Sequence, residues 1–561
     1  MAVVLINDKP VDIGNERLNL VQAAAKAGVF IPHYCWHPAL SVVASCRMCL
    51  VEVGDKKPDG TVAMQPRVVP ACQTPAKDGT VCITNSEKAK FSQARTLEGL
   101  LLNHPLDCPV CDKAGECMLQ DYSYRFGKAQ SRMIDPKNRP ANKPDIGEHL
   151  SLFTDRCIMC SRCVRFTREI SGSAELQVIN RGHHSEIDIF PGDPVNNPLA
   201  GNVVDLCPVG ALANKEFLYK QRVWFLKSQK SVCAGCSTGC SIHIDHNKDI
   251  VYRIRPRENP QAQGYFICDE GRFDFPYING KERFDRPLVK PAGERSEPAE
   301  SAVAWETALP DIRDVLKKSA SALAAVVSPM LTVEEAYLFA KLIKGFSPQA
   351  TLYLGWVPNV GKDESFPRDR KGNPVGPVKF TIRAEKCPNR RGVEEVLKHF
   401  QGEVLGFDRL IADISSPLPT GGEGAGVRRR PQALYLTAGY PPRLGAWLND
   451  EQTKTLSTIP LLIVQDLAPT PITQTARYVL PAATFAEKDG CFVNHANLAQ
   501  QIRWAVRPGT MGRTDGQIFL SLLGRRGLIQ ATKIRQELAA EIPFFAPLAV
   551  GDLGEFGVKL G

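Results

Sequence analysis

The cysteines of this chain are concentrated in one half of it, and this distribution constrains the fold more than any other feature. Sixteen of the eighteen cysteines precede residue 269 of a 561-residue sequence. Most of them fall into short groups in which Cys-x2-Cys spacing recurs. Thiols at this spacing bind metal ions or iron–sulfur clusters. We therefore expect a metal-binding N-terminal half and a C-terminal half that folds without metal.

The first group is formed by Cys35, Cys46, Cys49 and Cys72. Before it, VVLIND and the residues after DKP predict a hairpin, and LNLVQAAAKAG predicts a helix between an Asn19 N-cap and Gly28. Two strands, a helix and a long Cys-bearing loop are typical of plant-type [2Fe-2S] ferredoxins, although their first ligand spacing is shorter. Cys82 competes as fourth ligand, but it alternates within TVCIT like a buried strand residue, so we prefer Cys72.

Two further groups follow in HPLDCPVCDKAGEC and DRCIMCSRC. The second group is His104, Cys108, Cys111 and Cys117, and the third is Cys157, Cys160 and Cys163 with a remote fourth ligand, Cys207. A leucine-rich run before His104 predicts a helix that delivers it. Three thiolates and one imidazole hold either zinc or an iron–sulfur cluster, so the second stretch alone does not decide. In the third group, Thr167 stands where a fourth Cys would follow, whereas Cys207 precedes a proline as cluster ligands often do.

The fourth group lies in CAGCSTGC and YFICDEGR and consists of Cys233, Cys236, Cys240 and Cys268. By itself it fits a zinc ribbon as well as a cluster. SIHIDHNKDIVYRIR predicts a hairpin between these ligands, with His243 and His246 on its surface rather than on a metal. Fifteen cysteines and His104 thus form four sets of four, and only Cys82, Cys387 and Cys491 are left over. So clean a partition favours clusters.

The net charge agrees with this interpretation. The formal charge of +9 counts every cysteine as neutral. Fifteen thiolates add about −15 and four oxidised cores about +8, which leaves about +2. Basic residues lie within three positions of ligands at Arg47, Lys113, Arg156, Arg162 and Arg165. Because no basic stripe carries interleaved aromatic residues, we expect no nucleic-acid binding.

The sequence also bears on the cellular location. The N-terminus has no pattern of an export signal or a transit peptide. No stretch reaches the roughly 18 apolar residues of a membrane span. We therefore expect a reducing compartment, in which cysteines stay reduced or bind metal.

The C-terminal half shows a different pattern. LAAVV, ATLYLG, QALYLTAGYP, PLLIVQD and ARYVLPAA predict short buried strands between helices, which is typical of a doubly wound parallel sheet. Thr332 and Glu335 fit a helix capping box. The glycines of residues 415–431 lack dinucleotide-binding spacing, so we predict a flexible insertion there. No other nucleotide motif appears, and we expect that this chain does not itself bind NADH.

The order of the ligand sets, with RPRENP and CDEGRF, resembles the large iron–sulfur subunit family of respiratory complex I, NADH:quinone oxidoreductase, through about residue 280. The resemblance implies one [2Fe-2S] cluster on the first set and three [4Fe-4S] clusters on the other sets. The second of these four sets would include His104 as a ligand. The fourth resembles an extra site that only some bacterial members keep, off the main electron route.

The resemblance also implies an α+β iron–sulfur region followed by an α/β domain. The implied regions are 1–84 (β-grasp [2Fe-2S] ferredoxin), 85–124 (His-ligated [4Fe-4S]), 125–222 (ferredoxin-like [4Fe-4S]), 223–283 ([4Fe-4S] of the molybdopterin enzyme type) and 284–561 (shortened molybdopterin oxidoreductase-like). LPAATFAEKDGCFVN resembles a motif of that superfamily but departs from it at Cys491 and after Asn494. We therefore expect a structural Cys491 and no molybdopterin.

The implied function is electron relay. Electrons would come from a flavin-bearing, NADH-oxidising partner and pass toward a partner that reduces quinone, within a proton-translocating assembly of complex I subunits. The chain alone would hold no complete active site and would lie peripherally on the cytoplasmic face of a bacterial inner membrane.

Formate dehydrogenase and zinc-scaffold alternatives remain open, whereas a hydrogenase is disfavoured because only Cys387 and Cys491 follow the fourth group. An NAD-linked formate dehydrogenase subunit would need a pterin pocket and a reactive cysteine or selenocysteine, and the first cysteine after Cys268 is Cys387. An iron-only hydrogenase would need a second Cys-rich domain. A zinc-stabilised scaffold would need only the ligand sets.

Metal analysis separates clusters from zinc. We expect about fourteen iron atoms per chain and a brown protein after anaerobic purification, because one [2Fe-2S] and three [4Fe-4S] clusters contain that number. The zinc scaffold would instead contain about four zinc ions and be colourless. Iron and acid-labile sulfide determination measures the difference.

Overall fold

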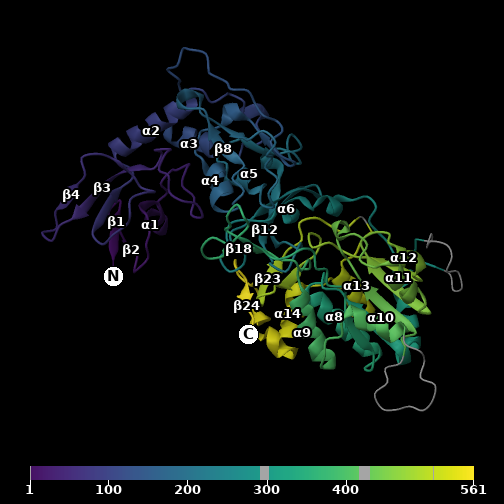
Figure 1. The fold of residues 1–561 in the computed structure, drawn as a ribbon. Coiled ribbons are helices and arrows are strands. Elements are labelled where there is room, and N and C mark those ends of the chain that lie inside the picture. Colours follow the sequence, from purple (N-terminus) through teal and green to yellow (C-terminus); the bar gives the residue numbers. More distant parts are fainter. Residues whose placement is uncertain (1, 291–301, 416–429, 510) are drawn as a thin grey trace. The chain divides into compact units, whose positions relative to one another are not determined.

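The computed structural model describes residues 2–290, 302–415, 430–509 and 511–561. These residues form two compact units (Figure 1). The first contains residues 1–226 and 366–378, and the second contains residues 227–365 and 379–561. The expected insertion at residues 415–431 lies almost wholly outside the described residues. No described helix is long and apolar enough to cross a bilayer.

The first unit begins with a mixed sheet that packs on helix α1 (Leu20–Lys26). The sheet order is β2-β1-β6-β3-β4, with β5 paired to β3. Its strands are β1 (Val3–Ile6), β2 (Lys9–Asp12), β3 (Leu50–Lys56), β4 (Val62–Met64), β5 (Val69–Pro70) and β6 (Thr80–Ile83). The predicted hairpin is confirmed as β1–β2. Asn19 is the N-cap of α1, as predicted, and it also forms a capping box with Gln22.

The rest of the first unit consists of short elements joined by long loops. Helix α2 (Glu87–Leu101) ends shortly before His104, as predicted. Strand β7 pairs with β10 and β8 with β9. The bounds are α3 (Met118–Phe126), β7 (Leu150–Leu152), α4 (Arg162–Glu169), β8 (Leu176–Ile179), β9 (Glu186–Ile189), α5 (Asn202–Leu206) and β10 (Leu212–Asn214). The segment 366–378 also belongs to this unit, where the backbone N–H of Arg368 donates to the carbonyl of Ile170.

The second unit begins with a three-stranded antiparallel sheet, which bears the fourth cysteine group at one end. Its strands are β11 (Lys227–Val232), β12 (Ser241–Asn247) and β13 (Ile250–Pro256). Strands β12 and β13 form the predicted hairpin, which turns at Lys248 and Asp249 with positive φ angles of 48° and 60°. Helix α6 (Asp269–Phe273) begins directly after Cys268.

A six-stranded sheet forms the core of the second unit in the order β14-β21-β20-β19-β15-β16. All its pairings are parallel except β14 with β21. The strands are β14 (Leu288–Val289), β15 (Leu323–Val327), β16 (Thr351–Leu354), β19 (Ala433–Thr437), β20 (Leu461–Asp466) and β21 (Tyr478–Pro481). Because β16 and β19 lie on opposite sides of β15, the doubly wound sheet predicted from the sequence is confirmed.

Helices cover both faces of this sheet. Side chains alternate along each strand, so Ala325 and Val327 pack against one layer of helices and Ala324 and Val326 against the other. The first layer contains α7 (Trp305–Lys318), α8 (Val333–Phe346), α9 (Arg390–Gln401), α13 (Asp515–Leu522) and α14 (Ala531–Glu541). The second contains α10 (Phe407–Ser415), α11 (Asp450–Ser457) and α12 (Pro471–Thr475). Two small sheets are also present. One pairs β17 (Glu364–Phe366) with β18 (Phe380–Ile382), and the other contains β22 (Gly490–Val493), β23 (Leu498–Ile502) and β24 (Val558–Lys559).

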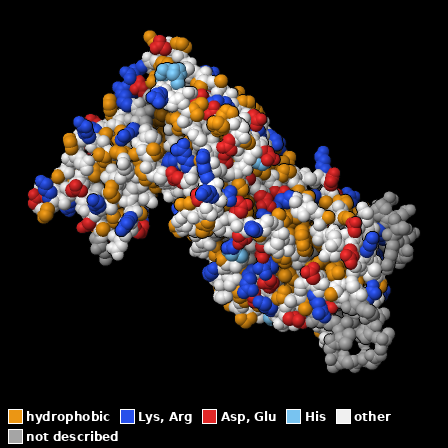
Figure 2. Space-filling model, viewed as in Figure 1, with side chains coloured by type: hydrophobic (Ala, Val, Ile, Leu, Met, Phe, Trp, Pro, Cys, Tyr) orange, Lys and Arg blue, Asp and Glu red, His pale blue; other side chains and the backbone are white. Residues whose placement is uncertain are grey.

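Charged side chains of both signs are interspersed over the face seen in Figure 2. Ion pairs among the described residues include Arg507–Asp249 at 2.6 Å and Lys215–Asp145 at 2.8 Å.

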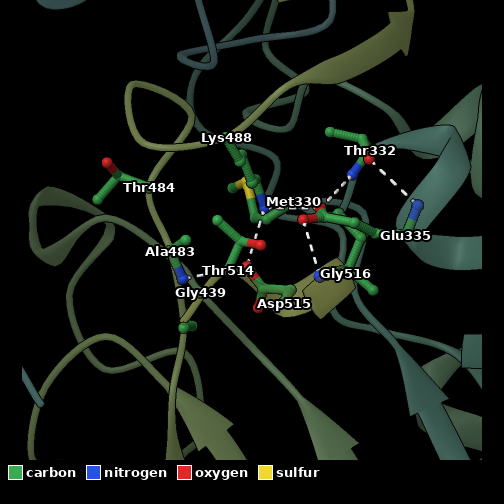
Figure 3. A network of polar contacts seen from close by, with 12 residues as sticks. Met330, Thr332, Glu335, Gly439, Ala483, Thr484, Lys488, Thr514, Asp515 and Gly516 are labelled. Atoms are coloured by element: carbon green, nitrogen blue, oxygen red, sulfur yellow. Dashed lines mark hydrogen bonds and ion pairs between the residues drawn. The ribbon is translucent and has the colours of Figure 1, made fainter. Parts of the chain in front are cut away.

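A buried charged network joins the helix layer to the end of the sheet in the second unit. Lys488 reaches toward two carboxylates, Glu335 at 2.8 Å and Asp515 at 3.2 Å (Figure 3). Glu335 also completes the predicted capping box with Thr332 at the start of α8. Asp515 is the first residue of α13, so both carboxylates lie at helix N-termini, where the backbone dipoles favour negative charge. All three charged side chains are at most 4% exposed.

Removal of Lys488 tests this network. We expect Lys488→Met to lower the free energy of unfolding by about 3–5 kcal/mol, because it leaves two buried carboxylates without their cation. Calorimetric unfolding of the full chain measures the change. The exposed Lys454 is the matched control, and Lys454→Met should change stability by less than about 0.5 kcal/mol. Equal stabilities of the two variants would contradict the prediction.

Candidate metal centres

All eighteen cysteines lie within the described residues, and all are free thiols. Within the described ranges, no three or more His, Cys, Asp or Glu side chains are grouped so as to hold a metal ion.

The first set lies on the loop between α1 and β3 and on the turn after β5. Strand pairing brings its two parts together, because Cys49 precedes β3, Cys72 follows β5, and the two strands are antiparallel neighbours. The Cys46 and Cys72 thiols hydrogen-bond to Cys35 and lower its pKa. A hydrogen bond with Cys72 likewise lowers the pKa of Cys49. The four side chains thus form one connected group.

Cys82 stands apart from this group. It is fully buried in β6, and burial alone raises its pKa to about 12. The predicted position in a strand is confirmed. The geometry therefore favours Cys72 over Cys82 as the fourth member of the set.

The second set surrounds a short turn between α2 and α3. Cys111 and Cys117 are buried, Cys108 is exposed, and burial raises the pKa of Cys117 to about 11. The Nδ1 atom of His104 is buried and has no hydrogen-bond partner within the described residues. An imidazole nitrogen and three thiols are the kinds of donor that a metal centre uses.

Two residues from later in the chain pack on this set. Gly210 approaches Cys111 so closely that a Cβ atom on it would lie 2.2 Å from the Cys111 sulfur. The Arg222 guanidinium donates hydrogen bonds to the carbonyls of Cys108 and Cys111 at 3.1 and 3.0 Å. The turn is therefore held by residues that lie about a hundred positions away.

The third set lies around one cavity. Cys157, Cys160, Cys163 and Cys207 all line it, together with apolar residues that include Leu152, Ile158 and Val209. Two residues of the Cys-rich loop, Met159 and Ser161, adopt left-handed φ angles of 51° and 56°. Burial raises the pKa of Cys160 to about 11, and the neighbouring Cys207 adds to the shift. Four thiols around an apolar hollow suit a bound cluster, whose positive iron would deprotonate them.

The fourth set lies between β11 and β12 and at the N-cap of α6. All four of its cysteines are buried. The backbone N–H groups of Gly235 and Gly271 donate to the sulfurs of Cys233 and Cys268, both at 3.3 Å. A Cβ atom on Gly271 would lie 2.9 Å from the Cys233 sulfur. Backbone hydrogen-bond donors therefore contact two of the four sulfurs in this set.

Three residues near the fourth set were not predicted from the sequence. Arg443 donates to the carbonyl of Gly235 at 2.8 Å and pairs with Glu270. Lys386 also pairs with Glu270, at 2.5 Å. The buried Cys387 interacts electrostatically with Cys236. No local sequence signal links these residues to the set, since they lie more than 115 positions after Cys268.

The remaining candidates fall outside the sets. His243 and His246 lie on β12, as predicted. Cys491 lies in β22 beside the buried Glu334, and burial raises its pKa far above the ordinary value. A protonated, fully buried thiol is unreactive, which agrees with a structural role.

Five family models match successive parts of the chain. They are a 2Fe-2S iron–sulfur cluster binding domain (4–87), the NADH-ubiquinone oxidoreductase-G iron–sulfur binding region (93–132), the ferredoxin-like domain of NADH-quinone oxidoreductase subunit 3 (147–213), the molybdopterin oxidoreductase Fe4S4 domain (226–280) and molybdopterin oxidoreductase (428–525). The chain therefore contains [2Fe-2S] and [4Fe-4S] binding domains, and the expected fold classes are confirmed.

Curated relatives extend these matches. The chain is 34% identical over 331 residues to the G subunit of NADH-quinone oxidoreductase from Rickettsia felis, covering 59% of this chain and 47% of the relative. It is 36% identical to the G subunit from Streptomyces coelicolor (58% and 37% covered) and to the NADH-ubiquinone oxidoreductase 75 kDa subunit of Reclinomonas americana (58% and 45% covered). The chain thus spans half or less of the length of these relatives.

A pair of substitutions tests the first set. Cys72→Ala should abolish the [2Fe-2S] EPR signal of the reduced protein, because it removes one of four connected thiols. Cys82→Ala is the matched control and should retain the signal, since only packing in β6 changes. Loss of the signal in Cys82→Ala, with Cys72→Ala unaffected, would reverse the assignment.

Proposed function

We propose, from the premise that this chain is a relative of the G subunit of NADH-quinone oxidoreductase, that it is an electron-relay subunit of such an assembly. The observation that carries the proposal is the presence of four separate ligand groups on one chain. Several one-electron sites on one chain suit electron transfer.

The proposed ligands are the four sets described above. One [2Fe-2S] cluster would be held by Cys35, Cys46, Cys49 and Cys72, and three [4Fe-4S] clusters by His104 with Cys108, Cys111 and Cys117, by Cys157, Cys160, Cys163 and Cys207, and by Cys233, Cys236, Cys240 and Cys268. The connected thiols of the first set, the orphaned His104 nitrogen and the cavity of the third set support this assignment.

The chain's own residues prepare these sites. A bound cluster supplies reversible one-electron chemistry with little movement of its ligands. Apolar side chains around the third set exclude water, and backbone N–H groups donate to sulfurs of the fourth set. Such hydrogen bonds and burial are the means by which a protein adjusts cluster potentials. A neutral imidazole at His104 leaves its site one negative charge lighter than four thiolates would.

The proposal includes partners and a location. Electrons would arrive from a flavin-bearing subunit that oxidises NADH and leave toward a subunit that reduces quinone, among other complex I subunits. The chain would lie peripherally on the cytoplasmic face of a bacterial inner membrane.

A formate dehydrogenase function is less well supported. It would need a reactive cysteine or selenocysteine, and Cys387 is fully buried with a pKa raised far above its ordinary value, mainly by burial. At the carboxyl edge of the parallel sheet, the buried Lys488 already forms ion pairs with Glu335 and Asp515. We therefore propose that the second unit holds no molybdopterin, and molybdenum found by elemental analysis would overturn this part.

Substitution of one ligand tests whether the fourth site lies on the electron route. Cys236→Ala should remove one [4Fe-4S] signal from low-temperature EPR of the reduced protein. If the site is off the route, NADH:quinone reductase activity of the assembled complex should stay largely intact. Cys160→Ala is the comparison and should abolish activity. A collapse of activity in Cys236→Ala, with assembly preserved, would refute the off-route assignment.

A further inference from the structure

Two buried arginines on helix α4 connect the first and third cysteine sets. Arg162 and Arg165 are 6% and 8% exposed, although arginine is rarely buried without a charged partner. The helix starts two residues after Cys160 and carries Cys163 itself. Both guanidinium groups therefore originate within the third set.

Their hydrogen bonds reach both sets. Arg165 donates through Nη2 to the carbonyls of Cys35 at 2.5 Å and Cys160 at 3.3 Å, which are backbone groups of one ligand from each set. Through Nη1 it also donates to the Ser41 carbonyl at 2.5 Å, farther along the first loop.

Arg162 makes a parallel connection. Its Nη2 atom donates to the carbonyl of Trp36, next to Cys35, at 2.6 Å. Its Nη1 atom donates to the carbonyl of Leu206, next to Cys207, at 3.2 Å. Each arginine therefore spans from a ligand loop of the first set to a ligand loop of the third.

The charges of these arginines are not balanced by carboxylates. Among the described residues, neither guanidinium lies within ion-pair distance of an Asp or Glu side chain. Buried cations are costly unless anions lie nearby, and carbonyl oxygens supply only partial charge. Negative charge on the two thiol sets would therefore stabilise the two buried positive charges between them.

We propose that Arg162 and Arg165 are a shared counter-charge for the clusters of the first and third sets, and that they raise both reduction potentials. The proposal rests on the proposed function, since it requires clusters on both sets. One-electron reduction adds one negative charge to a cluster, and two fixed cations nearby stabilise the reduced form. Because Arg165 touches the backbone of both sets, its loss should shift both potentials in the same direction.

Redox titration of the full chain, purified anaerobically, tests the proposal. Dithionite supplies the electrons, and EPR follows the reduced [2Fe-2S] and [4Fe-4S] signals separately. In Arg165→Gln we expect the ratio of reduced to oxidised cluster at a fixed potential to fall about tenfold for both sets, which corresponds to about 59 mV. Arg162→Gln should act in the same direction.

Matched variants separate charge from packing. Arg165→Lys keeps the charge but loses the forked hydrogen bonds. Both reduction potentials should therefore stay close to those of the unsubstituted protein. Arg168→Gln removes an exposed arginine from the same helix and should change neither.

Three outcomes would overturn the proposal: unchanged potentials in both Gln variants, a shift of one cluster alone, or equal shifts in Arg165→Lys and Arg165→Gln. If Arg165→Gln does not assemble, Arg162→Gln decides, because it spans the same loops. Absence of both EPR signals from the unsubstituted protein would instead refute the proposed function.

Discussion

Arginine side chains that bind backbone carbonyls hold the cysteine loops in place, and the candidate centres depend on this interaction. The loops contain little regular secondary structure, so few of their carbonyls are bound by helices or sheets. Arg162 and Arg165 bind carbonyls in the first and third sets, Arg222 in the second, and Arg443 in the fourth. A guanidinium carries five donors in a planar fork, which allows one side chain to fasten several carbonyls at once.

The same arginines place positive charge beside groups of thiols. Bound metal requires thiolates, and burial alone opposes their ionisation, as the raised pKa of Cys157, about 12, shows. Cations nearby lower this cost without occupying ligand positions. The second unit balances its buried charges differently, because Lys488 faces two carboxylates directly and needs no ligand.

Much of the local structure could be predicted from the sequence. The β1–β2 hairpin, the Asn19 cap of α1, the Thr332–Glu335 capping box and the parallel strands follow from turn chemistry and hydrophobic periodicity, which act over a few residues. The inclusion of residues 366–378 in the first unit was not predictable, because their contacts with Ile170 join positions almost two hundred residues apart.

By itself, the sequence determined the grouping of the cysteines, the pairing of His104 with three of them as a candidate set, and the class of each half. These conclusions follow from the spacing of the cysteine and histidine residues along the chain, because residues a few positions apart on one loop can bind the same centre. Only the tertiary structure decided that the Cys72 thiol hydrogen-bonds to Cys35, that Gly210 packs on Cys111, and that Arg165 spans two sets. The physical reason is that these choices depend on strand pairing and on the burial of charge, and residues distant in the chain meet only after folding.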